Sequence, residues 1–326
     1  MKTIKTAVLA ITFLAFGCGD GSTGQRVLPS SSGNINSLNV VIDNLLWENQ
    51  VGETIRNVLG APVEGLPQNE PLYSMRQMPP QVFSGFARNN RTVLKVEKGK
   101  PASISVENDV YARPQLVITV SGNTNAEIID QINTNANKLI DAFEKEELKE
   151  KQRRIGLSVK NDKDIEDALG ISLRIPSAYR IAKQDDKFFW IRKTTSKKGT
   201  IDIMLYELPL DAIRKGDSAV VDIVKARNAM GEAHIHGENE GSYMITETAY
   251  APYIYETILD NKPTLETKGI WDMKKDWMSG PFINYAIEDK INNRYVVLEG
   301  YAYAPSVKKR DYMFELEAIL KSVKVK

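Results

Sequence analysis

The sequence predicts an α+β protein built from two α/β halves, with mainly antiparallel sheets and helices packed on them. The chain has 326 residues, enough for two domains, and 42% of them are apolar, enough to bury a core. The first half alternates short apolar runs with stretches of helical periodicity. In the second half, extended segments follow one another through short turns, which is typical of antiparallel sheets.

Charge and cysteine content exclude several classes of function. Lysine and arginine total 43, and aspartate and glutamate total 42, so no excess charge favours nucleic acid or a polyanionic substrate. One cysteine excludes an intramolecular disulfide, and two histidines leave few soft ligands for a structural metal. We therefore expect no cofactor and no nucleic-acid partner.

Residues 1–17 have the pattern of a secretory signal peptide. Two lysines form a basic start, and residues 7–16 form an apolar run too short for a membrane span, which needs about 20 residues. The run ends at Gly17, directly before Cys18, the only cysteine. This order resembles a bacterial lipobox, which implies cleavage before Cys18 and acylation of its thiol and new amine. The alternative is a free thiol at the end of the leader.

Residues 18–36 are expected to form a flexible tether, because glycine, serine and asparagine are dense and core-forming side chains are few. About 18 such residues reach roughly 23–25 Å, which would hold a folded body just off a membrane. Gly19 stands where an aspartate retains some lipoproteins in the inner membrane. We expect an outer-membrane lipoprotein that faces the periplasm, with the cell surface as the alternative. The expected partners are the membrane, through acyl chains on Cys18, and an outer-membrane protein.

Residues 37–155 are expected to form the first half. The apolar run at 38–43 predicts a buried strand, and apolar residues four apart at 47–59 predict a helix that ends at Gly60. Three further extended segments are expected near residues 82–86, 92–96 and 116–120.

A second helix should close the first half. Thr124 and Glu127 have the spacing of a capping box, and the residues after them stay in helical phase for about 20 positions. The mixed charges at 144–151 predict a solvent-facing helix end. No linker rich in proline, glycine or serine follows, so we expect the two halves to pack as one rigid body.

Residues 156–326 are expected to form the second half. Short helices are predicted at 163–169 and at 219–230, the latter capped by Asp217, and an amphipathic helix at 309–320 closes the chain. The predicted strands lie at 171–175, 188–193, 201–206, 243–250, 265–273, 282–288 and 294–301.

Several short motifs carry a family resemblance. They are Val-Val-Ile-Asp at 40–43, Trp47, Val51 with Gly52, Gly-Leu-Pro-Gln-Asn-Glu-Pro-Leu-Tyr at 65–73, Gly-Pro-Phe at 280–282, Glu-Gly-Tyr at 299–301, Ala-Pro-Ser at 304–306 and Lys-Arg-Asp-Tyr at 309–312. From about residue 36 onward, the chain resembles an uncharacterised lipoprotein family of Bacteroidetes, domain of unknown function 4837. The family implies an envelope location and supplies no activity. The order of elements in the second half is also similar to PsbP- or Mog1-like modules.

His234 and His236 are the candidates for a metal site. In an extended segment both would lie on one face with Glu232 and Glu238, and these four groups could bind zinc. The glycines on both sides instead favour a polar loop. We therefore expect no metal at these histidines.

Other candidate sites have equally ordinary structural explanations. Ser218 lies in Asp-Ser-Ala, a pattern that resembles a periplasmic O-glycosylation site of these bacteria. Two interpretations are open for Tyr250, Tyr253, Tyr255, Trp271 and Trp277: they form an aromatic platform that binds sugar or peptide, or they pack in the core. Two are also open for Asp43, Asp272 and Asp276: they act as acidic catalysts, or they lie in polar surface turns.

No phosphate-binding glycine loop, His-Glu-x-x-His motif or Gly-x-Ser-x-Gly elbow occurs in the sequence. The sequence predicts a lipid-anchored, non-enzymatic accessory or binding subunit at the outer membrane. The alternative is a hydrolase of envelope polymers that acts through paired carboxylates.

The anchor leads to a direct test. Replacing Cys18 by alanine should release the protein from membranes, because the acyl chains supply the durable attachment. Membrane fractionation of the parent and of Cys18→Ala measures this. A variant that still fractionates fully with membranes would contradict the predicted anchor.

Overall fold

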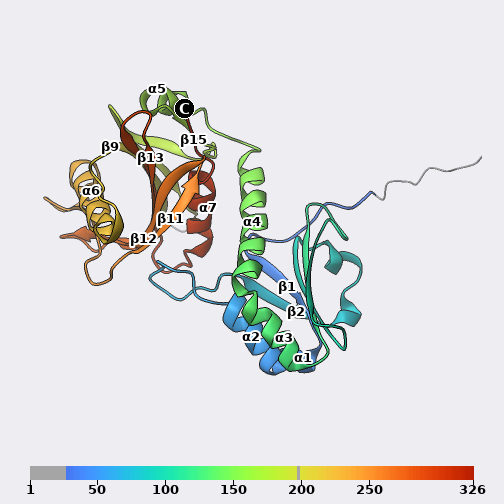
Figure 1. The fold of residues 1–326 in the computed structure, drawn as a ribbon. Helices are drawn as coiled ribbons and strands as arrows, with labels where there is room; N and C mark the ends of the chain where they lie inside the picture. Colours follow the sequence, from blue (N-terminus) through green and yellow to red (C-terminus); the bar gives the residue numbers. More distant parts are fainter. Residues whose placement is uncertain (1–26, 197–198) are drawn as a thin grey trace, which may run out of the picture.

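Two sheet-centred halves make up the protein, and helix α4 (Ala136–Ile155) lies between them (Figure 1). The computed structural model describes residues 27–196 and 199–326. The predicted signal peptide, Cys18 and the first part of the predicted tether lie outside these ranges. Helices pack on mainly antiparallel strands, so the predicted α+β fold class is confirmed. No helix within the described ranges is long and apolar enough to cross a membrane.

The first half contains a five-stranded sheet in the order β2-β1-β3-β5-β4. The strands are β1 (Ser37–Val41), β2 (Ser74–Met78), β3 (Thr92–Lys98), β4 (Ser103–Asn108) and β5 (Leu116–Gly122). Only β4 runs antiparallel to its neighbour, so this sheet departs from the antiparallel pattern that we expected. The chain returns from β1 to β2 through two helices, and such crossovers connect parallel strands.

Both long helices predicted for the first half are broken in two. The first is divided into α1 (Asn44–Glu48) and α2 (Gln50–Leu59), and the second into α3 (Asn125–Thr134) and α4. Each break lies at an asparagine, Asn49 or Asn135, whose side-chain amide donates to the carbonyl four residues earlier. Such local bonds compete with helical ones. The predicted cap is confirmed, since Thr124 Oγ1 accepts from the N–H of Glu127.

The two faces of the first sheet are covered differently. Helices α2, α3 and α4 pack on one face through a continuous apolar cluster that includes Ile42, Ile55 and Phe143. The short helices η1 (Pro80–Val82) and η2 (Gly85–Asn89) cover the other face around Phe83.

The second half contains an eight-stranded antiparallel sheet in the order β10-β12-β13-β14-β9-β8-β7, with β11 also paired to β12. The strands are β7 (Arg180–Asp185), β8 (Phe188–Thr194), β9 (Thr200–Pro209), β10 (Tyr243–Thr246), β11 (Tyr253–Leu259), β12 (Lys262–Lys274), β13 (Ser279–Asp289) and β14 (Arg294–Tyr303). A small pair, β6 (Ile171–Ser172) with β15 (Lys324–Val325), lies beside helix α5 (Lys163–Leu169).

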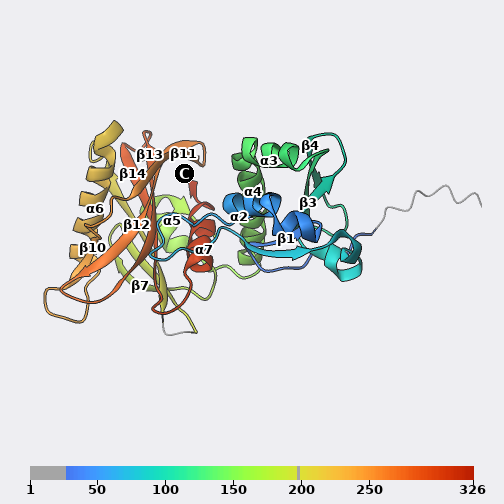
Figure 2. The same ribbon diagram turned by 90° about the horizontal axis from the view of Figure 1, so that it is seen from below.

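Helices α6 (Ala219–His234) and α7 (Arg310–Leu320) cover opposite faces of the second sheet (Figure 2). The predicted cap of α6 is wrong. Asp217 lies in the short helix η3 (Gly216–Ser218), and the N-cap residue of α6 is Ser218, which makes no side-chain capping bond.

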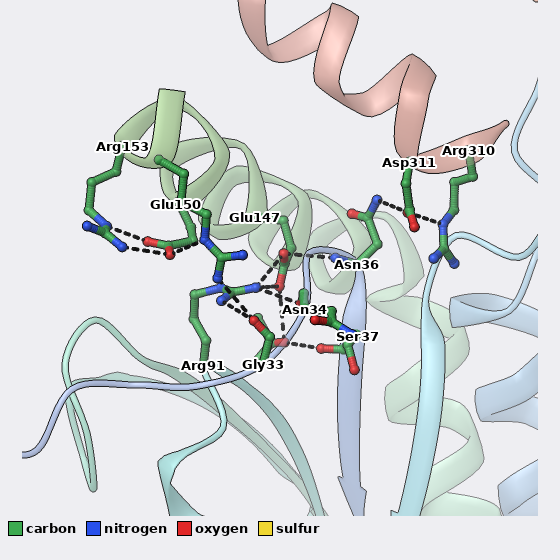
Figure 3. A network of polar contacts seen from close by, with 12 residues as sticks. Gly33, Asn34, Asn36, Ser37, Arg91, Glu147, Glu150, Arg153, Arg310 and Asp311 are labelled. Carbon is green, nitrogen blue, oxygen red and sulfur yellow. Dashed lines mark hydrogen bonds and ion pairs between the residues drawn. The ribbon is translucent and has the colours of Figure 1, made fainter. Parts of the chain in front are cut away.

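A buried ion pair fixes the segment that precedes β1 (Figure 3). Arg91 Nη2 lies 2.8 Å from Glu147 Oε2, and the two side chains are 1% and 0% exposed. Glu147 also accepts from the N–H of Asn36, while Arg91 donates to the carbonyls of Gly33 and Asn34. The expected solvent-facing helix end therefore contains a carboxylate that no water reaches.

The same contacts correct the predicted tether. We expected residues 18–36 to be flexible, but residues 29–36 are bonded to the folded body. The N–H of Ser31 donates to Arg113, and the N–H of Ser32 donates to Asn89. Small polar residues leave the backbone accessible, so these backbone groups find partners in the first half.

The two halves contact each other through α4, α7 and one loop. Lys151 of α4 lies 2.7 Å from Glu315 of α7, and Gln152 donates to the carbonyl of Ala318. Glu70, in the loop before β2, is 3% exposed and accepts from the N–H groups of Lys309 and Arg310. A carboxylate of the first half thus satisfies the free N–H groups at the start of a helix in the second.

Replacing Glu147 by glutamine should lower the free energy of unfolding by about 3–5 kcal/mol, because Arg91 would remain buried without its counter-charge. Chemical denaturation measures the change. Asp141→Asn, at an exposed position of the same helix, is the matched control and should change stability by less than about 0.5 kcal/mol. Equal small effects in both variants would contradict the structural role of the pair.

Candidate functional site

A groove of about 980 Å³ lies on the second sheet beside the start of α6. Its floor includes the apolar side chains of Ile254, Leu265, Ala286 and Tyr295, and residues 214–217, 219 and 220 form one wall. This volume falls at the upper end of the 300–1,000 Å³ that is typical of ligand sites.

The wall is held by a second buried ion pair. Arg227 of α6 lies 2.8 Å from Glu299 of β14, and both side chains are almost fully buried. Arg227 also donates to Thr246 Oγ1, and Asn284 donates to Glu299. These bonds satisfy the charges on both elements and fix α6 against the sheet.

The floor depends on a tight hairpin between β11 and β12. The two turn residues, Asp260 and Asn261, have φ values of +47° and +60°. Aspartate and asparagine tolerate this left-handed conformation and are common in two-residue hairpin turns. Asp260 also accepts from Lys324 Nζ and from the N–H of Val325, which attaches the turn to β15.

The outer edge of β11 is open. In the part of the chain that the structure describes, β11 pairs only with residues 262–268 of β12. The two-residue turn makes Leu259 and Lys262 a hydrogen-bonded pair, and such pairs alternate along the strands. The outward N–H and C=O groups therefore belong to Ile254, Glu256 and Ile258. All three residues also line the groove.

Two cations stand at the rim of the groove. Lys215 and Lys290 lie 3.9 and 3.6 Å from the same Glu288 carboxylate, and both lysines are mostly exposed. Neighbouring Arg214 is already paired with Asp222, whose pKa it lowers to about 2 through hydrogen bonds. An apolar floor, an open backbone edge and a charged rim thus meet in this groove.

Paired carboxylates, which the hydrolase alternative requires, occur at the junction of the halves. Glu144 and Glu317 flank Lys321, and burial raises the pKa of Glu144. Burial would also raise the pKa of Glu317, but Lys321 and Lys268 outweigh it and lower the pKa. The adjacent cavity is about 100 Å³, well below the size of ordinary ligand sites. Because lysines neutralise Glu144 and Glu317 and the cavity beside them is small, a structural role is favoured for these two carboxylates over a catalytic one.

The two histidines point to different partners. His234 ends α6, and its ring stacks on Phe188 at 3.9 Å between centroids. Burial, and to a smaller extent Lys183, lowers the pKa of His234. His236 is exposed, and its Nε2 lies 2.8 Å from the carbonyl of Glu232. Within residues 27–196 and 199–326, no three or more His, Cys, Asp or Glu side chains gather in a metal-binding group.

The prediction of a polar loop around these histidines is partly wrong. Helix α6 continues to His234, so Gly231 lies inside the helix. A Cβ at Gly231 would stand 2.0 Å from the carbonyl oxygen of Met244. This glycine permits close packing of α6 against β10 and does not indicate a mobile loop.

The structure does not gather all five predicted aromatic residues on one surface. Trp271 is buried against Tyr301, whereas Trp277 is 94% exposed. Tyr255, on β11, donates to Glu64 of the first half. The predicted acidic catalysts bond to nearby backbone N–H groups, as Asp43 does to Leu45. Ser218 is half-buried beside the groove, and its glycosylation stays a prediction.

The groove itself was not foreseen from the sequence. Its floor comes from four strands and its wall from a segment about 40 residues earlier in the chain, so no local pattern joins them. The Asp-Asn pair before a strand was the one available signal, since it marks a tight hairpin.

The histidines provide a quantitative test. His234→Ala should cost about 1 kcal/mol of stability, because it removes a stacked ring. His236→Ala should cost almost nothing, because that ring is exposed, and neither variant should change the metal content of the purified protein. Denaturation and elemental analysis measure both. Stoichiometric zinc that disappears in the double variant would overturn this interpretation.

Comparisons with known proteins place the chain among uncharacterised domains. Residues 158–322 match the model of the domain of unknown function DUF4837, and residues 31–156 match that of the domain of unknown function DUF8532. No curated protein matches the chain. The comparisons do not confirm the likeness to PsbP- or Mog1-like modules.

One similar solved structure is a crystal structure from Bacteroides thetaiotaomicron VPI-5482. Its sequence is 8% identical, the TM-score is 0.27, and the match covers 48% of this chain and 45% of that one. The chain thus spans less than half the length of that relative. The DUF4837 model covers slightly more than half of the present sequence, and the chain belongs to the DUF4837 family.

Proposed function

We propose that the protein is a lipid-anchored, non-enzymatic binding subunit of the outer membrane that faces the periplasm. Its groove beside β11 takes an extended segment of a partner protein. The observation that carries this proposal is the open edge of β11, whose outward backbone groups belong to the residues that line the groove.

Backbone hydrogen bonding and burial of apolar side chains both favour an extended polypeptide segment as the ligand of the groove. An extended segment added to β11 would hydrogen-bond to Ile254, Glu256 and Ile258, and alternate side chains of that segment would face the apolar floor. Main-chain bonds supply affinity in this mode, and pockets for alternate side chains supply specificity.

The position of the groove is compatible with an anchor at Cys18. In Figures 1 and 2 the second half lies on the opposite side of α4 from the blue segment that precedes β1. A membrane at the N-terminal end would therefore leave the groove accessible to a partner protein.

The open edge is tested by two substitutions at one exposed position. Glu256→Pro removes the central outward N–H, whereas Glu256→Ala removes the same carboxylate and keeps the N–H. Random linear peptides selected by display on the lipid-free chain, expressed from residue 19, provide the ligands. Calorimetry should show binding to Glu256→Pro weakened roughly fivefold or more and binding to Glu256→Ala nearly unchanged.

Hydrogen exchange supplies an independent measurement. Bound peptide should protect the amides of Ile254, Glu256 and Ile258 and leave the intervening amides unchanged, because those already pair with β12. Peptides that bind both variants equally, or a selection that recovers no peptide, would contradict the proposed function. Equal unfolding temperatures of the two variants show that the fold is intact.

A further inference from the structure

An exposed apolar segment lies at the N-terminal end of the first half. Phe86 is 92% exposed, Val82 is 55% exposed and Val27 is 94% exposed. Phe86 and Val82 belong to η2 and η1, which Figures 1 and 2 show in teal at the end of this half farthest from the second half. The start of the described chain lies beside η2, since the N–H of Ser32 donates to the carbonyl of Asn89.

The charge of this segment has one sign. Residues 76–91 contain no aspartate or glutamate and three arginines, of which Arg91 is buried against Glu147. Arg76 and Arg88 are exposed, and Arg88 stacks over the ring of Tyr111. Exposed aromatic and aliphatic side chains among arginines are typical of surfaces that enter the interface of an anionic bilayer.

The N-terminal segment brings this surface close to the anchor. Backbone bonds hold residues 29–32 between Arg113 and Asn89, so the body begins eight residues earlier than the predicted tether allows. Nine residue steps separate Val27 from Cys18, and a fully extended chain covers about 30–32 Å in nine steps. An anchor at Cys18 would therefore keep Val27, at this end of the first half, within about 32 Å of the bilayer.

We infer that η1 and η2, through Phe86 and Val82 with Arg76 and Arg88 around them, form a membrane-contact surface that docks the body on anionic lipid. This inference rests on the proposed lipid anchor. Docking would orient the first half towards the bilayer and direct the groove of the second half away from it.

The test uses the acylated protein in vesicles of phosphatidylethanolamine and phosphatidylglycerol. Acylation consumes the thiol of Cys18, so Phe86→Cys creates the single site for a fluorescent label. Trp277→Cys is the matched control, because Trp277 is 94% exposed and belongs to the second half. Lipids brominated in the acyl chains should quench the label at position 86 and leave the label at position 277 unchanged.

The outcomes separate this inference from the proposed function. If the acylated protein does not float with the vesicles, the anchor itself is wrong. If it floats and both labels are equally bright, the anchor stands and the membrane-contact surface is wrong. A label at position 86 that responds only in native membranes, and not in pure lipid, would assign this surface to a protein and overturn the inference. Unchanged unfolding temperatures would show that both labelled variants are folded.

Discussion

The ion pair between Arg91 and Glu147 is the constraint on which the arrangement of the first half depends. Two opposite charges lie where water does not reach, so each must satisfy the other and the surrounding polar groups. Glu147 receives the N–H of Asn36 and the hydroxyl of Thr92, and Arg91 reaches two carbonyls of the N-terminal segment. The pair thereby fixes three parts of the chain, namely α4, the start of β3 and the segment before β1.

The position of α4 in turn determines how the halves meet. One side of this helix packs on the first sheet around Phe143, and Lys151 and Gln152 contact α7. Glu70 adds a second connection, because its carboxylate caps α7 from the first half. Glu315 receives Lys151, Lys193 and the hydroxyl of Tyr179, so the contact also reaches β8. Polar contacts at this junction therefore align the two cores.

The two proposed surfaces lie in different halves and use different physics. At η1 and η2, exposed apolar side chains and arginines suit a lipid surface, where burial of apolar area and attraction to anionic headgroups add together. At β11, unpaired backbone groups beside an apolar floor suit an extended polypeptide, where directional hydrogen bonds select the ligand. A rigid junction would let attachment at one end present the groove at the other.

Local patterns in the sequence determined much of the fold class. Periodicity identified most helices and strands of the second half, and the spacing of Thr124 and Glu127 identified a real cap. The leader before Cys18 is a sequence signal alone.

Tertiary structure decided which charged side chains pair with each other. The charged residues at 144–151 have the same composition whether they face water or a buried arginine, so composition does not identify their partners. Glu147 follows Phe143 by one helical turn, in phase with the buried stripe, and this was the one hint in the run. Arg91 and Glu70 find partners 56 and 239 residues away, and the groove joins strands to a distant helix start. Such pairings depend on chain folding in three dimensions, because no local periodicity specifies which distant groups will meet.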